Sequence, residues 1–166
     1  MRLKDEIKLK SGKRLPKGYI LSSNNNGHPY IKVKDMDAYK TKLNDNFEYL
    51  PDELVTKLSN YTVKTNDIIL SIVGTIGNVS IIDKSLDGAN LTENCVKLIT
   101  NEKYLSSFLY YYLISNKGQS EISKGIVGST QPKLPFYNIE NIEIPNLNIL
   151  EQQHIVNTIC SFLKFL

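Results

Sequence analysis

The sequence contains few of the residues that bind metals or form disulfide bonds: among its 166 residues are two cysteines and two histidines. Cys95 and Cys160 lie far apart, and neither has a second metal-ligating residue at a useful spacing. This pattern argues against a zinc site of the cysteine and histidine type, and nothing else predicts a metal or a cofactor. We therefore expect both cysteines to be buried thiols in a reducing compartment.

Long apolar runs are missing as well. No stretch of eighteen apolar residues occurs, which argues against a membrane span, and residues 1–6 lack the apolar stretch of a secretion signal. There is no internal repeat and no low-complexity linker. Because a chain of this length can bury a hydrophobic core, the sequence predicts one folded unit in the cytoplasm, away from membranes.

Recognisable catalytic motifs are also absent. His28 falls in an expected turn and His154 on the solvent or partner face of the last expected helix, and no nucleophile elbow accompanies them. Residues 74–78 lack the lysine and hydroxyl pair of a phosphate-binding loop, and they lead into a β-branched run instead of a helix. We interpret them as a glycine turn between two core strands, and we predict no catalytic residue.

The positive charge is concentrated at the amino end. Residues 1–42 hold 11 Lys and Arg against 4 Asp and Glu, whereas residues 43–103 hold 5 against 9 and residues 104–166 hold 4 against 4. A basic end on a protein with a net charge of +3 is compatible with a surface that faces phosphates. The alternative is that these lysines are simply solvated.

Period-two and β-branched patterns predict strands over residues 19–21, 29–34, 68–73, 79–82, 95–100 and 142–144. The run at 68–73 is bounded by turn signals, which is typical of a buried central strand. A helix is expected to begin at Pro51, with Leu50, Leu54 and Leu58 inside. Another is expected over 104–115, where one apolar stripe contains Leu105, Phe108, Leu109, Tyr112 and Leu113.

A last helix is expected to begin after Asn148, because Glu151 stands three positions later as in a helix cap. Its apolar residues recur at spacings of 4, 3 and 4, which is the heptad spacing of a coiled coil. We expect this stripe to be a subunit interface formed by Ile155, Ile159, Phe162 and Leu166. Strands and helices that do not alternate strictly predict an α+β fold.

Four ordered blocks give the chain a family resemblance. They are a glycine and cation loop at 11–16, a Pro-Tyr-Ile segment at 27–36, an Asp-Ile-Ile-Leu-Ser to Gly-Thr-Ile-Gly segment at 66–77, and the end from the Gly-Ser-Thr-Gln loop at 128–134 through Ile-Pro to residue 156. Together they resemble a target recognition domain of the DNA specificity subunit of type I restriction-modification systems. Asn66 replaces the family's usual glycine, a mild departure because asparagine tolerates the same turn conformation.

The resemblance implies a mixed, mostly antiparallel twisted sheet with a few short helices. It also implies a recognition domain at residues 1–148 and, at 149–166, the start of a helix that becomes a coiled-coil spacer. Family members carry two such domains in one chain, so this chain resembles one half. Expected partners are double-stranded DNA, methyltransferase (modification) subunits, a restriction subunit where one is present, and a second specificity half or a second copy of this chain.

If the resemblance holds, loop and strand residues contact DNA. Lys13 and Arg14 form a flexible cation pair suited to phosphate or a guanine edge, and Lys32 and Lys34 are expected on one face of a strand. The full predicted set is Lys13, Arg14, Lys32, Lys34, Thr75, Ser129, Thr130, Gln131 and Lys133. The plain alternative for each is a solvated loop residue.

Two other classes of function stay open at this point. A metal-dependent nuclease or small hydrolase predicts acids clustered in one pocket. A truncated specificity fragment that acts as a protein-interaction module predicts complexes with methyltransferase that need no DNA and are insensitive to salt.

Overall fold

The fold is described from a computed structural model, in which residues 1–164 are placed. The main sheet has five strands in the order β1-β8-β5-β6-β3. All neighbours are antiparallel except β3 and β6, which are parallel. In spatial order these strands are β1 (Lys8–Ser11), β8 (Cys95–Ile99), β5 (Ile68–Ser71), β6 (Val79–Ile82) and β3 (Tyr39–Thr41).

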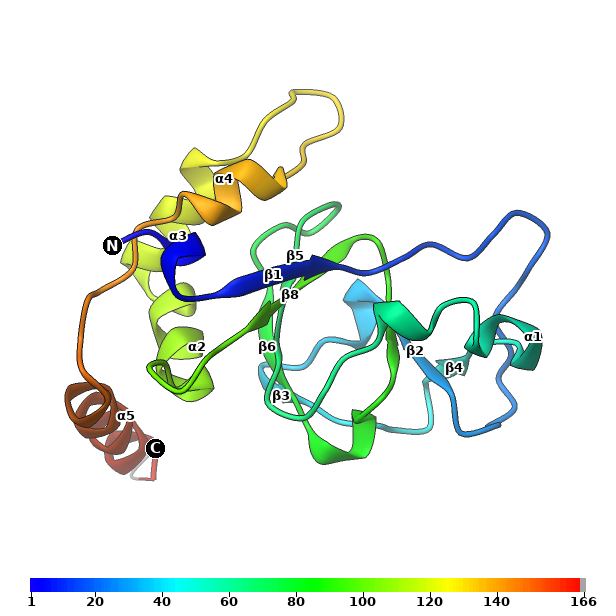
Figure 1. Cartoon of the computed structure of the whole chain (residues 1–166), viewed down its shortest axis with the longest axis horizontal. Helices are drawn as coiled ribbons and strands as arrows, with labels where there is room; N and C mark the ends of the chain where they lie inside the picture. Colours follow the sequence, from blue (N-terminus) through cyan, green and yellow to red (C-terminus); the bar gives the residue numbers. More distant parts are fainter. Residues whose placement is uncertain (165–166) are drawn as a thin grey trace.

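A smaller sheet packs beside the first. Its middle strand β2 (Pro29–Ile31) pairs antiparallel with β4 (Glu48–Tyr49) and parallel with β7 (Asn90–Leu91). Figure 1 shows the small sheet on one side of the main sheet and the longer helices on the other. The predicted α+β fold with a mixed, mostly antiparallel sheet is therefore confirmed.

Strand β5 lies at the centre of the main sheet, as the sequence predicts, and all four of its residues are buried. Successive side chains of a strand point to opposite faces. Ile68 and Leu70 accordingly join the core under the helices, and Ile69 joins the core between the two sheets. The β-branched run at 68–71 is apolar on both faces because it separates two cores.

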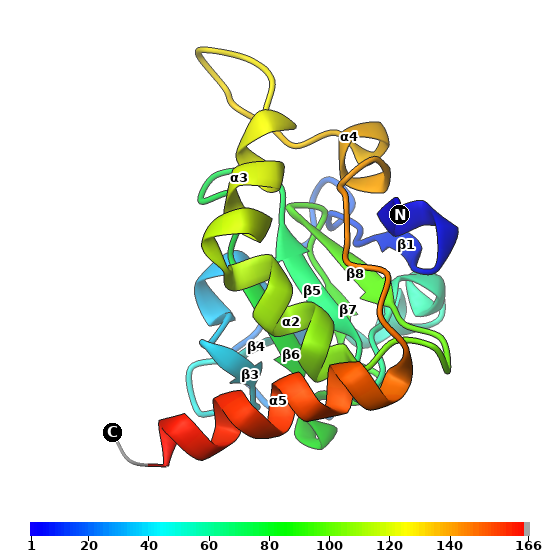
Figure 2. The same cartoon turned by 90° about the vertical axis from the view of Figure 1, so that its left-hand side faces the viewer.

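Helices cover the outer face of the main sheet (Figure 2). Helix α2 follows the expected stripe, with Phe108, Leu109 and Leu113 buried. Tyr110 is buried as well, and its hydroxyl accepts a hydrogen bond from the Tyr39 N–H at 2.9 Å. The helices are α1 (Asp52–Val55), α2 (Ser106–Ile114), α3 (Asn116–Lys124), α4 (Phe136–Glu140) and α5 (Ile149–Leu163). Around α1, the expected inner residues Leu50, Leu54 and Leu58 are buried together.

Five expected strands are wrong or too long; two of them, at 68–73 and 95–100, only extend past the ends of β5 at Ser71 and β8 at Ile99. The strand at 29–34 ends at Ile31, because the Asp35 carboxylate accepts the Lys32 N–H at 2.8 Å and the chain turns into a 3-10 helix at Val33–Asp35. Residues 19–21 form no strand; only Ser22 pairs, with Tyr49. Residues 142–144 are extended but make a single bridge to the amino end, which turns away at once into a 3-10 helix.

The cysteines differ from each other. Cys95 is fully buried, and burial raises the pKa of its thiol to about 12, which keeps it protonated. The prediction for Cys160 is wrong: it lies on α5 at the border of the contact with α2 and is only half-buried.

Within the placed residues, no helix combines the length and apolarity needed to cross a membrane.

Helix α5 begins where its cap was predicted. The Asn148 side chain accepts the N–H groups of Leu150 and Glu151 at 3.0 Å, and the Glu151 carboxylate accepts the Asn148 N–H at 2.8 Å. Gln152 is fully buried at the start of α5. Its side chain accepts the Leu105 N–H and donates to the carbonyls of Lys103 and Leu147. These bonds hold the first turn of α5 against the loop that precedes α2.

Candidate nucleic-acid interface

One edge of the main sheet collects the candidate DNA-binding residues. Strands β1 and β5 end at this edge and β6 and β8 begin there, since Ser11 pairs with Val96, Ser71 with Cys95, and Leu70 with Val79. The connections 12–17, 72–78 and 92–94 leave the sheet at this edge. With residues 127–134, described next, we call them the loop edge; it runs along the top of Figure 1.

The loop between α3 and α4 joins this edge by backbone pairing. Val127 and Lys133 exchange two hydrogen bonds of 2.9 Å, Lys133 also pairs with Val73, and the Leu134 N–H donates to the Ile72 carbonyl at 2.9 Å. Gly128 turns the loop with a φ of +89°, a conformation in which other residues are strained. The side chains of Ser129, Thr130 and Gln131 are exposed in this loop, whose backbone pairs through Lys133 with the turn that carries Thr75.

Three predicted cations line one groove. Arg14, Lys32 and Lys34 share an open groove of about 510 Å³, which we call the basic groove; its other lining residues are Leu15, Tyr30, Val33, Thr92, Glu93 and Asn94. Arg14 comes from the loop after β1, whereas Lys32 and Lys34 follow β2. The expectation that both lysines lie on a strand is wrong, but the 3-10 turn still brings them to the same place.

Two carboxylates pair with the cations of the basic groove: Glu93 lines the groove, and Glu48 contacts its two lysines from β4. The Arg14 Nε lies 3.0 Å from the Glu93 Oε1, and the Lys34 Nζ lies 3.7 Å from the Glu48 Oε2. The Lys32 ammonium contacts the same Glu48 oxygen. Lys32 is the least exposed of the three cations, and its burial lowers the pKa of the ammonium.

Lys13 lies at the border of this groove. Its ammonium stands 5.6 Å from the centre of the Tyr61 ring, a cation–π distance, and its carbonyl accepts the Tyr30 hydroxyl at 2.9 Å. Burial raises the pKa of Tyr30 to about 12, so this hydroxyl remains a hydrogen-bond donor at neutral pH. The turn after β1 is thus fixed at its backbone while the Lys13 side chain stays exposed.

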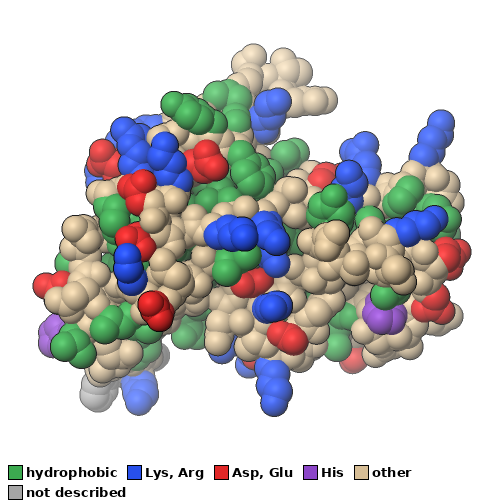
Figure 3. Space-filling view, in the orientation of Figure 1, with side chains coloured by type: hydrophobic (Ala, Val, Ile, Leu, Met, Phe, Trp, Pro, Cys, Tyr) green, Lys and Arg blue, Asp and Glu red, His purple; other side chains and the backbone are tan. Residues whose placement is uncertain are grey.

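Backbone hydrogen bonds join the groove to the two loops. Asn94, which lines the groove, accepts the Ile72 N–H at 2.8 Å, and Ile72 in turn accepts the Leu134 N–H. All nine predicted residues therefore lie along the loop edge or in the groove beside it. In the space-filling view of Figure 3, Lys and Arg side chains are spread along the same upper side, where the outline is notched. Their contact with DNA stays a prediction.

No sequence pattern predicts that these two acids lie beside the cations. Glu48 lies in β4 and reaches Lys32 only because β4 pairs with β2, with Tyr30 opposite Glu48. Glu93 stands in the short turn before β8, far along the chain from Arg14. Neither position belongs to a recognisable motif, so only the pairing of distant strands could reveal them.

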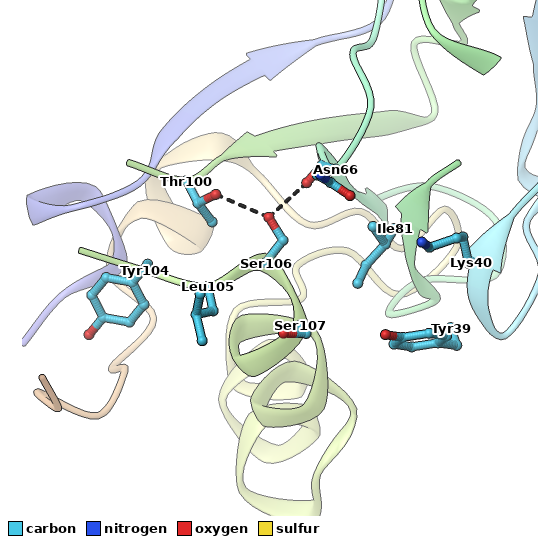
Figure 4. Close-up of a pocket in the computed structure, with 9 residues that line it drawn as sticks. All are labelled: Tyr39, Lys40, Asn66, Ile81, Thr100, Tyr104, Leu105, Ser106 and Ser107. Atoms are coloured by element: carbon cyan, nitrogen blue, oxygen red, sulfur yellow. Dashed lines mark hydrogen bonds between the residues drawn. The ribbon is translucent and has the colours of Figure 1, made fainter. Parts of the chain in front are cut away.

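A second hollow, of about 460 Å³, lies toward the opposite end of the main sheet (Figure 4). Three of its polar groups bond each other: the Ser106 hydroxyl donates to the Asn66 carbonyl at 2.8 Å and lies 3.1 Å from the Thr100 hydroxyl. Lys40 is the one charged residue among those that line it, and no carboxylate does.

Across residues 1–164, no group of three or more His, Cys, Asp or Glu could hold a metal ion. The clustered acids that a nuclease requires are not seen there.

The residues of the expected subunit interface on α5 differ in how deeply they are buried. Ile155 packs against the core under the helices and Ile159 is half-buried, whereas Phe162 is 70% exposed. Leu166 lies outside the described residues. The inner face of α5 is formed instead by Gln152 and Val156. The predicted stripe thus flanks the inner face, and its outer part is accessible.

One family of known proteins matches the whole chain. A family model described as "Type I restriction modification DNA specificity domain" matches residues 1–166. Among curated proteins, the chain is 26% identical over 158 residues to the "Type I restriction enzyme MjaVIII specificity subunit" of Methanocaldococcus jannaschii. That match covers 92% of this chain and 36% of the relative, so the chain spans just over a third of its length.

Solved structures show the same fold at low identity. One is a chain from a study of complex assembly and conformational transition of the type I R-M system, with a TM-score of 0.75 at 17% identity, covering 98% of this chain and 37% of that one. Another is the HsdS subunit from Thermoanaerobacter tengcongensis, with a TM-score of 0.69 at 18% identity, covering 98% and 36%. Both likenesses extend over nearly all of the present chain.

Proposed function

This chain belongs to the type I restriction modification DNA specificity domain family, and we propose that it binds double-stranded DNA in a sequence-specific manner through its loop edge and basic groove. The convergence of the nine candidate residues supports this proposal. They come from four separate blocks of the sequence, yet they lie along the loop edge or in the groove beside it. A surface assembled from distant loops on a rigid sheet is a common way to build a recognition site.

Within this surface the residues divide by chemistry. Lys13, Lys32, Lys34 and Lys133 suit phosphate oxygens, and such contacts position a protein on the duplex without reading its sequence. Base reading falls to the exposed loop, where Gln131 can bind adenine in a bidentate manner and Ser129 and Thr130 supply hydroxyls. The side chains of Arg14 and Thr75 suit either a phosphate contact or a base contact. The side chains on the loop edge, and no catalytic group of this chain, carry the proposed activity.

The wider role is proposed from the family. We infer that the chain recognises one half of a bipartite target and directs a type I adenine methyltransferase and its restriction complex in the cytoplasm. The curated relative is named as a specificity subunit, and the present chain spans about a third of it, the size of one recognition unit. In this proposal residues 1–148 read DNA, and residues 149–166 begin the helix that joins a second half or a second copy.

The proposal is tested by sequencing the methylome of the host with and without this gene. We expect at least one methylated adenine motif to depend on the gene. Binding of the purified protein to duplexes that carry the motif should then weaken steeply as salt rises, since each neutralised phosphate releases counterions. An unchanged methylome together with DNA-free, salt-insensitive binding of a methyltransferase would instead favour a protein-interaction module.

A further inference from the structure

All three cations of the basic groove are paired with one of two acids, Glu48 and Glu93. Glu48 contacts two lysines through one oxygen, Oε2, and Glu93 bonds Arg14 through Oε1 while its Oε2 accepts the Thr92 hydroxyl at 3.0 Å. Three cations predicted to bind phosphate are therefore held by carboxylates in the DNA-free protein. A surface selected only to attract phosphate would not carry acids at these points, because carboxylates repel phosphates.

The backbone fixes both acids in place. Glu48 lies in β4, paired opposite Tyr30, which itself lines the groove. Glu93 follows Thr92, whose N–H donates to the Ile31 carbonyl at 3.0 Å and whose carbonyl accepts the Cys95 N–H at 3.2 Å. The two carboxylates are thus held at the groove by strands β2, β4 and β8, and their presence there does not depend on a flexible loop.

We propose that Glu48 and Glu93 restrain Lys32, Lys34 and Arg14 and so limit the affinity of this surface for DNA of any sequence. This inference rests on the proposed function. Non-specific binding comes almost entirely from phosphate contacts, whereas binding to the target adds base contacts. Acids that compete with phosphate therefore weaken both kinds of complex by a similar factor, so they set the overall affinity while the base contacts set the ratio of specific to non-specific binding.

Substitution of these acids is compatible with an intact fold. The Glu48 and Glu93 side chains are 37% and 34% exposed, and ion pairs at such positions contribute little to stability. Glutamine keeps the shape and can still accept a hydrogen bond. The variants Glu48→Gln and Glu93→Gln are made separately, so that the two sites test the proposal independently, and circular dichroism reports whether each variant is folded.

The matched control is Glu102→Gln. Glu102 is exposed in the turn after β8, at the end of the sheet away from the loop edge, and it forms no ion pair among residues 1–164. This change removes the same unit of negative charge from the whole protein. Any effect of Glu48→Gln beyond that of Glu102→Gln therefore comes from the groove and not from the net charge.

The experiment measures binding of the full chain to a labelled random-sequence duplex by fluorescence anisotropy over a series of salt concentrations. If Glu48→Gln frees one further phosphate contact, the slope of log K against log salt should steepen by about 0.9, and affinity at 0.1 M salt should rise roughly eightfold. Glu93→Gln should act in the same direction. On a duplex that carries the methylated motif the gain should be similar, because the same phosphate contacts are freed.

Three results would contradict the inference. Binding of Glu48→Gln and Glu93→Gln equal to that of Glu102→Gln would show that the acids do not restrain the cations. Weaker binding would show that the carboxylates contact DNA directly, for example at a cytosine amino group. A wild-type chain that binds no duplex would overturn the proposed function itself, and the inference with it; that failure is distinguishable because it precedes any substitution.

Discussion

Val73 and Lys133 pair as an antiparallel bridge, which joins the turn after β5 to the loop between α3 and α4. The pairing makes one unit of the turn that carries Thr75 and the loop that carries Gln131. Because β5 is buried on both faces, this unit rests on the most rigid part of the sheet. The candidate base-reading residues are exposed, yet their backbone is anchored at both ends of the loop.

The conformation of this loop depends on Gly128. Gly128→Val places a β-branched residue at a φ of +89°, with its Cβ 3.0 Å from the Gln131 carbonyl oxygen. The strain is about 1–2 kcal/mol, which should depopulate the native loop and weaken target binding roughly 5- to 30-fold. DNA binding and thermal melting are measured together. Gly88→Val is the control, because Gly88 has a φ of +83° but lies near the start of β5, away from the loop edge. Equal loss of binding in both variants would contradict the role of the loop.

Gln131 and Lys133 should differ in what they contribute. Gln131→Ala should cost about 1–3 kcal/mol on the target and relax the preferred base at one position, because a bidentate base contact is lost. Lys133→Gln should instead weaken binding to every sequence and reduce the salt slope by about 1, as expected for a phosphate contact. Titrations of target and random duplexes at several salt concentrations separate the two effects. A uniform loss from Gln131→Ala would assign that residue to the backbone of DNA.

Local signals in the sequence predicted the parts of the fold that depend on local physics. The run at 68–71 is apolar at every position but the last, and it proved to be buried on both faces. Asn148 and Glu151 stand three positions apart, and they form the predicted reciprocal cap. In each case the residues that decide the structure are neighbours in the chain.

The parts that could not be predicted depend on pairing between distant segments. Strands β4 and β7 contain two residues each, too few to show a period, and they exist because β2 lies between them. The same pairing brings Glu48 to Lys32 and creates the basic groove. The four blocks of sequence therefore predicted which residues lie close together, but not the acids that form ion pairs with them.

The buried amide of Gln152 should govern stability and not DNA contact. Gln152→Ala leaves one N–H and two carbonyls near α2 and α5 without a partner, which should lower the free energy of unfolding by about 2–4 kcal/mol. Gln153→Ala is the matched control: the Gln153 side chain is exposed and, among residues 1–164, bonds only Asn157, so the free energy of unfolding should change by no more than about 0.5 kcal/mol. Denaturant unfolding of both variants measures the difference. Similar values for the two would mean that Gln152 does not hold α5 in place.

Phe162 offers the sharpest test of association through α5. Its side chain is 70% exposed, so Phe162→Asp removes little packing from the domain, whereas Ile155 packs against the core and would report folding instead. We expect the wild-type protein to exceed monomer mass at high concentration and Phe162→Asp to remain monomeric, because a charge in an apolar helix seam is poorly tolerated. Asn157→Asp adds the same charge on the side of the helix away from the stripe, given 3.6 residues per turn, and should leave association unchanged. Sedimentation velocity over a concentration series measures all three proteins. A wild-type chain that stays strictly monomeric, or one whose association survives Phe162→Asp, would remove this stripe as the contact between halves.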